Sequence, residues 1–253
     1  MTQAGTPQTP GLKPKIVAVI QSCYIPWRGF FDVINMSDEF VLYDDAQYTR
    51  RDWRNRNQIK TAQGLKWLTI PVEVKGKYHQ KIGDTRIADP NWPRLHWETI
   101  HHVYSKAACF HEYSGLIEQL YLGCRETMLS MVNYRFLTAI NQLLGIHTKI
   151  SWSSDYRLDG DKSVRLLNIC KQAGATHYLS GPSAKAYLDE ALFRREGVEV
   201  VWIDYSGYRE YRQQHPPFAP HVSIVDLLLN EGAGARKFLK TATKSSSPLL
   251  DTA

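Results

Sequence analysis

The densest group of side chains that could carry out chemistry lies between positions 44 and 60. Two adjacent carboxylates come first, and positions 50–60 then hold five cations and one anion, a local charge of +4. A carboxylate can accept a proton from a sugar hydroxyl or an ammonium group, and a guanidinium can bind phosphate through paired hydrogen bonds. Aromatic and amide side chains alternate with the arginines, which favours a binding loop over a solvated charged connection. The candidate residues are Asp44 and Asp45 as catalytic groups, and Gln47, Tyr48, Trp53, Arg54, Asn55, Arg56 and Lys60 as substrate-binding groups.

A second candidate site is the turn after the first predicted strand, where we select Gln21, Tyr24 and Trp27. A helix is expected to begin near Pro26, and its unpaired N–H groups could bind an anion. The turn lacks the glycine fingerprint of dinucleotide-binding proteins, a phosphate-loop lysine and the paired histidines of nucleotidyl-transferring enzymes. The alternative, that Tyr24 and Trp27 fill the core, stays equally open.

A third candidate is the segment that holds Ser180, Gly181, Ser183 and Lys185. Glycine and small hydroxyl residues let backbone N–H groups approach a phosphate, and Lys185 could add a positive charge. Helix capping by Ser183 is the competing interpretation.

His215 is a candidate general base, because it precedes two prolines on a rigid loop and its unperturbed pKa lies near neutrality. The competing interpretation is a structural loop. The sequence contains no nucleophile elbow and no zinc-ligand spacing, and we assign no metal ligand.

Composition limits the class of protein. The chain has 253 residues, 43% of them apolar and 22% charged, with a formal net charge of +6, which excludes a disordered or collagen-like chain. Aromatic residues make up 11%, enough to line a cleft as well as a core. The four cysteines form no C-x-x-C pair, and no apolar run approaches the length of about 18 residues that a membrane span needs. We expect a soluble cytoplasmic protein without a signal peptide.

Hydrophobic patterning predicts an α/β fold: a three-layer, Rossmann-like parallel sheet with a helical insertion around residues 91–145. Continuous apolar runs with β-branched residues indicate buried parallel strands, and amphipathic segments between them indicate helices. The predicted strands are 16–21, 39–43, 67–72, 149–152, 176–180 and 198–203. Three helices are expected within 91–145, broken near 110 and 123. We predict a flexible leader over 1–14, one domain over 15–235 and a flexible tail over 236–253. Ligands of such sheets bind outside the carboxyl ends of the strands, where Asp44 and Asp45 are expected.

Four segments together resemble the WbqC-like protein family. They read QSCYIPWRGFFDVI at 21–34, DDAQYTRRDWRNRNQIK at 44–60 with WLTIPV at 67–72, YLSGPSAKAYL at 178–188, and SIVDLLLNEG at 223–232. Ser22 and Cys23 depart from the Gln-Pro type of sequence expected in relatives. The resemblance implies a role in bacterial surface-polysaccharide (O-antigen type) biosynthesis, with acyl or aminoacyl transfer to an amino sugar. It supplies no catalytic residues.

Three hypotheses follow. The first is a transferase that acts on a small nucleotide-linked amino sugar, with an acyl or aminoacyl donor or a nucleoside triphosphate as co-substrate. The second is an adenylating or nucleotidyl-transferring enzyme in which the 21–31 and 180–185 turns hold a triphosphate. The third is a non-catalytic glycan- or nucleic-acid-binding module, although no nucleic-acid-binding motif accompanies the basic segment. We prefer the first, and the sequence assigns no oligomeric state.

Overall fold

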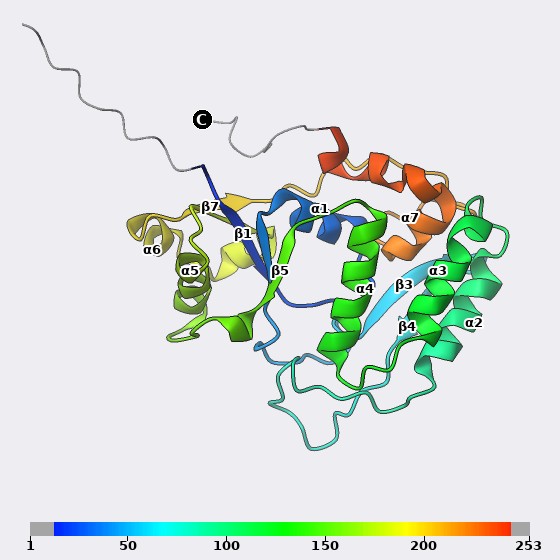
Figure 1. Ribbon diagram of the computed structural model, residues 1–253, viewed down its shortest axis with the longest axis horizontal. Coiled ribbons are helices and arrows are strands. Elements are labelled where there is room, and N and C mark those ends of the chain that lie inside the picture. Colours follow the sequence, from blue (N-terminus) through cyan, green and yellow to red (C-terminus); the bar gives the residue numbers. More distant parts are fainter. Residues whose placement is uncertain (1–12, 244–253) are drawn as a thin grey trace, which may run out of the picture.

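The centre of the molecule is a five-stranded parallel sheet, shown in Figure 1 for the computed structural model, which describes residues 13–243. Its strands are β1 (Ile16–Ile20), β2 (Glu39–Leu42), β5 (Lys149–Trp152), β6 (His177–Ser180) and β7 (Glu199–Trp202). They lie in the order β5-β2-β1-β6-β7. The chain builds outward from β1 to β5 and then returns to β6, so the direction of winding reverses between β1 and β6. This is the Rossmann strand order, and the predicted parallel α/β fold is confirmed.

Helices cover both faces of the sheet because β1 is apolar on both sides. Val17 and Val19 belong to one core, with α5 (Lys162–Gln172) and α6 (Glu190–Arg195). Ile16 and Ala18 belong to the other core, with α1 (Arg28–Met36) and α7 (Ile224–Glu231). Successive strand side chains point to opposite faces, so a continuous apolar run can serve two cores. The three layers follow from this alternation.

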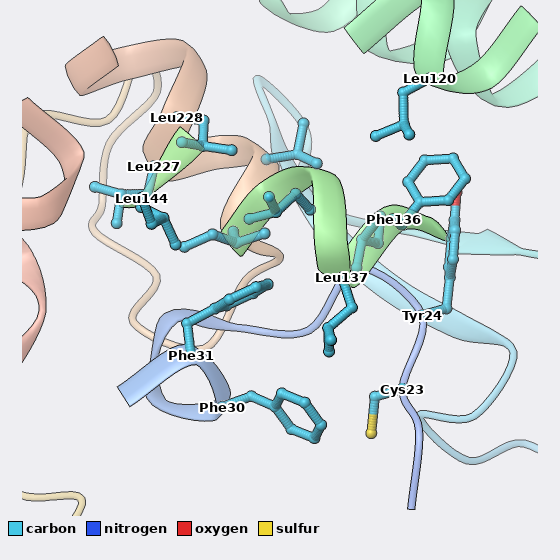
Figure 2. Close-up of a cluster of buried hydrophobic side chains, with 14 of the residues drawn as sticks. Cys23, Tyr24, Phe30, Phe31, Leu120, Phe136, Leu137, Leu144, Leu227 and Leu228 are labelled. Carbon is cyan, nitrogen blue, oxygen red and sulfur yellow. The ribbon is translucent and has the colours of Figure 1, made fainter. Parts of the chain in front are cut away.

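The helical insertion consists of α2 (Trp92–Tyr104), α3 (Phe110–Leu122) and α4 (Leu129–Leu143). Both predicted breaks are present. At Gly123 an added Cβ would lie 2.6 Å from the carbonyl oxygen of Gln119, so glycine is required where α3 ends. Figure 2 shows Leu120 and Phe136 of this insertion beside Tyr24, while Phe31 of α1 lies beneath Leu227 and Leu228 of α7. The insertion therefore shares the larger core with the sheet.

A two-stranded antiparallel hairpin, β3 (Arg56–Thr61) with β4 (Gly64–Thr69), corrects the sequence-based prediction. Part of the segment interpreted as a binding loop is strand β3, and the strand predicted at 67–72 begins and ends earlier. The inner face of β3 holds Asn57 beside Ile59, and the side-chain amide of Asn57 donates to the carbonyls of Tyr24 and Ile25. A polar residue buried by hydrogen bonds hides the alternating apolar pattern that identifies a strand.

Short 3-10 helices complete the fold: η1 (Ser153–Asp155), η2 (Pro182–Ala186), η3 (Gly232–Phe238) and η4 (Lys240–Thr243). The boundary predicted at 235 falls inside η3, and Leu239 beyond it is buried in the core. The rest of the predicted leader and tail, 1–12 and 244–253, lies outside the described residues. Over the part of the chain that the structure describes, no helix is long and apolar enough to cross a membrane.

Candidate functional site

A cleft of about 850 Å³ lies at the carboxyl ends of β1, β2 and β6, where the strand order reverses. This is the position at which open α/β sheets bind their ligands. Seven of the candidate residues line it. Gln21, Asp45, Gln47 and Arg54 come from the N-terminal segments, and Ser180, Gly181 and Ser183 come from the turn after β6. The structure therefore brings together residues from three of the four candidate segments.

Asp45 is the carboxylate that a ligand in the cleft can reach. Its Oδ1 accepts a hydrogen bond from Lys81 Nζ at 2.7 Å, and its Oδ2 accepts one from Ser153 Oγ at 2.8 Å. Burial alone would raise the pKa of Asp45, but the bonds from Lys81 and Ser153 outweigh it and hold the pKa below its ordinary value. Asp45 is therefore an anion at neutral pH.

Asp44 lies beneath the cleft rather than in its wall. Its exposed fraction is 4%, and its Oδ1 accepts a hydrogen bond from the backbone N–H of Ser22 at 2.8 Å. Its Oδ2 has no hydrogen-bond partner among the described residues. Burial raises the pKa of Asp44, against the lowering effect of its bonds with Ser22 and the charge of Arg54. We conclude that of the two adjacent carboxylates only Asp45 faces the cleft.

Arg54 joins the end of β1 to the loop that follows β2. Its Nη1 donates to the carbonyl oxygens of Gln21 at 3.1 Å and Ser22 at 3.3 Å, and its Nε lies 3.7 Å from Asp52 Oδ2. The side chain is largely buried yet contributes to the cleft wall. Arg54 thus supplies a fixed positive charge to the cleft wall, and this charge acts on the buried Asp44.

The first turn of α5 adds two cations that sequence reasoning missed. Lys162 and Arg165 both line the cleft, and α5 begins at Asp161, whose side chain accepts from the backbone N–H of Val164 at 3.0 Å. The N-terminal end of a helix carries a partial positive charge, so the two side chains and the helix dipole act in the same direction. The pattern of an Asp N-cap followed by basic residues was visible in the sequence, but nothing there placed it beside the 44–60 segment.

Tyrosine rings form the apolar part of the cleft. Tyr43, Tyr187 and Tyr205 line it, and the ring of Tyr205 packs against Trp27 with centroids 5.3 Å apart. A Cβ added at Gly181 would lie 3.6 Å from the Tyr205 hydroxyl, an ordinary contact distance, so the turn after β6 passes close to this ring. None of these three tyrosines was among the predicted site residues, because their convergence depends on the tertiary fold.

Several predicted residues do not line the cleft. Tyr24 is fully buried, and its hydroxyl is hydrogen-bonded to His96 Nδ1 at 2.9 Å and to the Tyr121 hydroxyl at 2.7 Å. Trp27 packs its ring over the first turn of α1, where an added Cβ at Gly29 would collide with it. Both rings therefore pack against other parts of the protein, which is the alternative interpretation given for this turn.

The remaining predicted residues also fall outside the cleft lining. Tyr48, Asn55 and Lys60 are buried. Arg56 begins strand β3 of the hairpin, and Trp53, in the turn before β3, packs against Trp67 of β4. Lys185 lies over the ring of Trp202. His215 Nε2 lies 3.1 Å from Gln214 Nε2, and the same amide nitrogen donates to the carbonyl of Val103 in α2. His215 thus packs beside α2 and is not placed to act as a base in the cleft.

Cys23 is the cysteine nearest the cleft, and it is buried with an exposed fraction of 6%. Burial raises the pKa of its thiol, so the sulfur stays protonated and is a poor nucleophile. Within residues 13–243, no group of three or more His, Cys, Asp or Glu side chains could hold a metal ion. The chemistry available at this site is that of one carboxylate, several cations and tyrosine hydroxyls.

The fold defines a Rossmann-type α/β protein whose cleft is lined by three cations, Arg54, Lys162 and Arg165, and the carboxylate of Asp45. The model of the WbqC-like protein family matches residues 21–238, and the chain belongs to this family, as its motifs predicted. It is 52% identical over 226 residues to the uncharacterized protein Rv1507c of Mycobacterium tuberculosis (strain ATCC 25618 / H37Rv), which covers 89% of this chain and 98% of that protein. No solved structure matches the chain significantly.

Proposed function

We propose that the chain is a transferase of bacterial surface-polysaccharide biosynthesis whose cleft binds a nucleotide-linked amino sugar and promotes acyl or aminoacyl transfer to its amine. One observation carries the proposal. At the point where the sheet's strand order reverses, a single cleft of about 850 Å³ combines an ionised carboxylate, Asp45, with three cations, Arg54, Lys162 and Arg165. A nucleotide sugar needs both, because its diphosphate is anionic and its amine is cationic or hydrogen-bonding.

The diphosphate is assigned to the α5 side of the cleft. Lys162 and Arg165 stand there at a helix N-terminus, and Arg54 adds a further cation from the β1 side. In the turn after β6, Gly181 and its neighbours leave room for the diphosphate to approach the backbone N–H groups of the protein. The tyrosine rings of the cleft offer flat surfaces for the base or the sugar.

Asp45 is assigned to the amine. A carboxylate with a lowered pKa is a weak base, so its main contribution is to hold and orient the amine rather than to remove a proton completely. In the transfer, the amine nitrogen forms a bond to the acyl carbon, the bond from that carbon to the donor's leaving group breaks, and the proton that the nitrogen loses passes to the departing group. The acyl or aminoacyl donor itself is a proposed co-substrate.

An adenylating enzyme would need the 21–31 turn to hold a triphosphate. The indole of Trp27 covers the first turn of α1 there and packs against Tyr205, Tyr208 and His221. This packing favours the transferase over the adenylating alternative.

The test is a thermal-shift screen with uridine and thymidine diphosphate sugars, with and without an amino group. A ligand present at about 100 times its Kd stabilises the folded state by about 2.7 kcal/mol. We expect the amino sugars to raise Tm and Arg165→Ala to weaken their binding at least tenfold. The matched control is Arg194→Ala, an exposed arginine of α6 outside the cleft. Equal binding by Arg165→Ala, or no stabilisation by any nucleotide sugar, would contradict the proposal.

A further inference from the structure

The outer face of the β3–β4 hairpin carries an exposed aromatic pair. Trp53 is 41% exposed and Trp67 is 39% exposed, and their ring centroids lie 5.3 Å apart with an angle of 40° between the planes. Large apolar side chains that gather on a surface mark interaction sites more often than isolated ones do. Neither ring contributes to the core clusters. Burial in the core therefore does not account for the pair.

Two polar side chains adjoin these rings. The Arg56 guanidinium lies over the Trp67 ring, 4.1 Å from its centroid, and donates through Nη2 to the carbonyl of Arg51. Gln58 pairs directly with Trp67 across the hairpin, so both side chains stand on the same face. The side-chain amide of Gln58 makes no hydrogen bond to any residue within 13–243. We call Trp53, Arg56, Gln58 and Trp67 the hairpin platform.

We propose that the hairpin platform binds an acidic glycan chain. Pyranose rings present C–H faces that pack on indole rings, while their hydroxyls and carboxylates need hydrogen-bond partners. The platform supplies both kinds of group side by side: two indoles, one amide and one guanidinium. A guanidinium binds a carboxylate with two parallel hydrogen bonds, which selects sugars that carry an acidic group.

The local charge supports an anionic ligand. Of the three arginines in residues 51–56, Arg54 faces the cleft, and Arg51 and Arg56 with the carboxylate of Asp52 leave a net charge of +1. Asp52 is already engaged, because its Oδ2 accepts from Thr49 Oγ1 at 2.5 Å and its Oδ1 accepts from the backbone N–H of Trp53 at 2.7 Å. The positive charge of the arginines is therefore only partly balanced at the platform.

The geometry favours a sugar over a nucleobase. The two indoles are in contact, so a flat base cannot enter between them, and their tilt makes one bent surface.

The platform and the cleft share one loop. Thr49 and Arg54 of this loop line the cleft, and Trp53, which lies between them in the sequence, belongs to the platform. One loop, held by Asp52, therefore carries part of both sites. The inference stands apart from the proposed reaction, because the platform lies outside the cleft.

The experiment is isothermal titration of the full chain with three acidic oligosaccharides: tetragalacturonate, a hyaluronan tetrasaccharide and α2,8-linked trisialic acid. Maltotetraose is the neutral comparison. We expect saturable binding of at least one acidic probe, weaker binding at higher salt, and no comparable binding of maltotetraose. Trp67→Ala should weaken that binding at least tenfold, Gln58→Ala should weaken it by a smaller factor, and Trp67→Phe should restore part of it.

The control variant is Leu95→Ala, which removes a side chain that is 47% exposed on α2 and does not belong to the platform. It should bind the probe as the wild type does. Arg165→Ala should also keep glycan binding while losing nucleotide-sugar binding, so that failure of one proposal is separable from failure of the other. The platform proposal is overturned if no acidic probe binds at millimolar concentration, or if Trp67→Ala binds equally well. Binding of oligothymidylate instead, or a dimer in sedimentation that Trp67→Ala dissociates, would overturn it as well.

Discussion

Lys81 Nζ lies 2.7 Å from Asp45 Oδ1, and this ion pair holds the one carboxylate of the cleft in its ionised form. The lysine side chain is 54% exposed and the aspartate 20% exposed, so the pair sits at the cleft's edge. A ligand amine could compete with Lys81 for the same oxygen. The ion pair with Lys81 therefore keeps Asp45 ionised, and a cationic group that binds Asp45 would replace Lys81 as its partner.

Lys81→Met should raise the pKa of Asp45, because burial then acts against only the bond from Ser153 and the charge of Arg165. The folded-state pKa of Asp45 is depressed, so the pair stabilises the protein above the ordinary pKa of aspartate and loses this effect as pH falls through the folded value. Since the pair is partly exposed, Lys81→Met should lower the free energy of unfolding at pH 7 by less than about 1 kcal/mol. Carbon-detected NMR titration of the Asp45 carboxyl measures the pKa, and an unchanged value would show that the ion pair does not form.

His96 should make the protein less stable in mild acid. Burial lowers its pKa to about 4, with Nδ1 bonded to the Tyr24 hydroxyl and Nε2 lying 3.2 Å from the Thr69 carbonyl oxygen. The unfolded state binds a proton near the unperturbed pKa of about 6.5, so the folded state loses relative stability as pH falls from there to about 4. The loss amounts to about 3 kcal/mol at 1.36 kcal/mol per pKa unit.

Urea denaturation of the wild type and His96→Gln at pH 7, 5.5 and 4 tests this expectation. The variant should be less stable than the wild type at pH 7, and the difference should shrink as pH falls. A constant difference across the three values would mean that His96 titrates normally in the folded state.

Phe136→Ala should destabilise the core that the helical insertion shares with the sheet. Phe136 is 1% exposed and lies 4.7 Å, centroid to centroid, from Tyr121 and 5.7 Å from Tyr24. Deletion of a buried phenylalanine ring costs about 3–5 kcal/mol. Met131→Ala on the same helix, where the side chain is 44% exposed, should change stability by less than about 0.5 kcal/mol. Chemical denaturation compares the two, and equal losses would contradict the assignment of Phe136 to the core.

Tyr24→Phe should separate a structural role from a binding role. The change leaves His96 Nδ1 and the Tyr121 hydroxyl without the central partner of their buried network, at a cost of about 1–3 kcal/mol. Nucleotide-sugar affinity should stay within twofold of the wild type, because Tyr24 does not line the cleft. A tenfold loss of affinity with unchanged stability would restore Tyr24 to the binding site.

The sheet was predictable because β1 and β2 are apolar runs and helical patterns alternate with the strands, and the position of the cleft followed from the rule for strand ends. Asp45 and Ser180 converge for that reason. Residue type could not show which of Asp44 and Asp45 faces the cleft, because adjacent side chains point to different surroundings. Nor could it show whether Trp27 stacks on a ligand or on its own helix. Strand β3 was hidden because Asn57 is buried through hydrogen bonds rather than apolar contact.

The central claim is that the cleft beside α5 holds the diphosphate of a nucleotide sugar. Amide hydrogen exchange of the full chain, with and without a saturating uridine diphosphate amino sugar, tests it most directly. The account predicts slower exchange in the first turn of α5, around Lys162 and Arg165, and in the turn at 180–183. Slower exchange confined to the 21–31 turn, or no change at either of the predicted places, would contradict it.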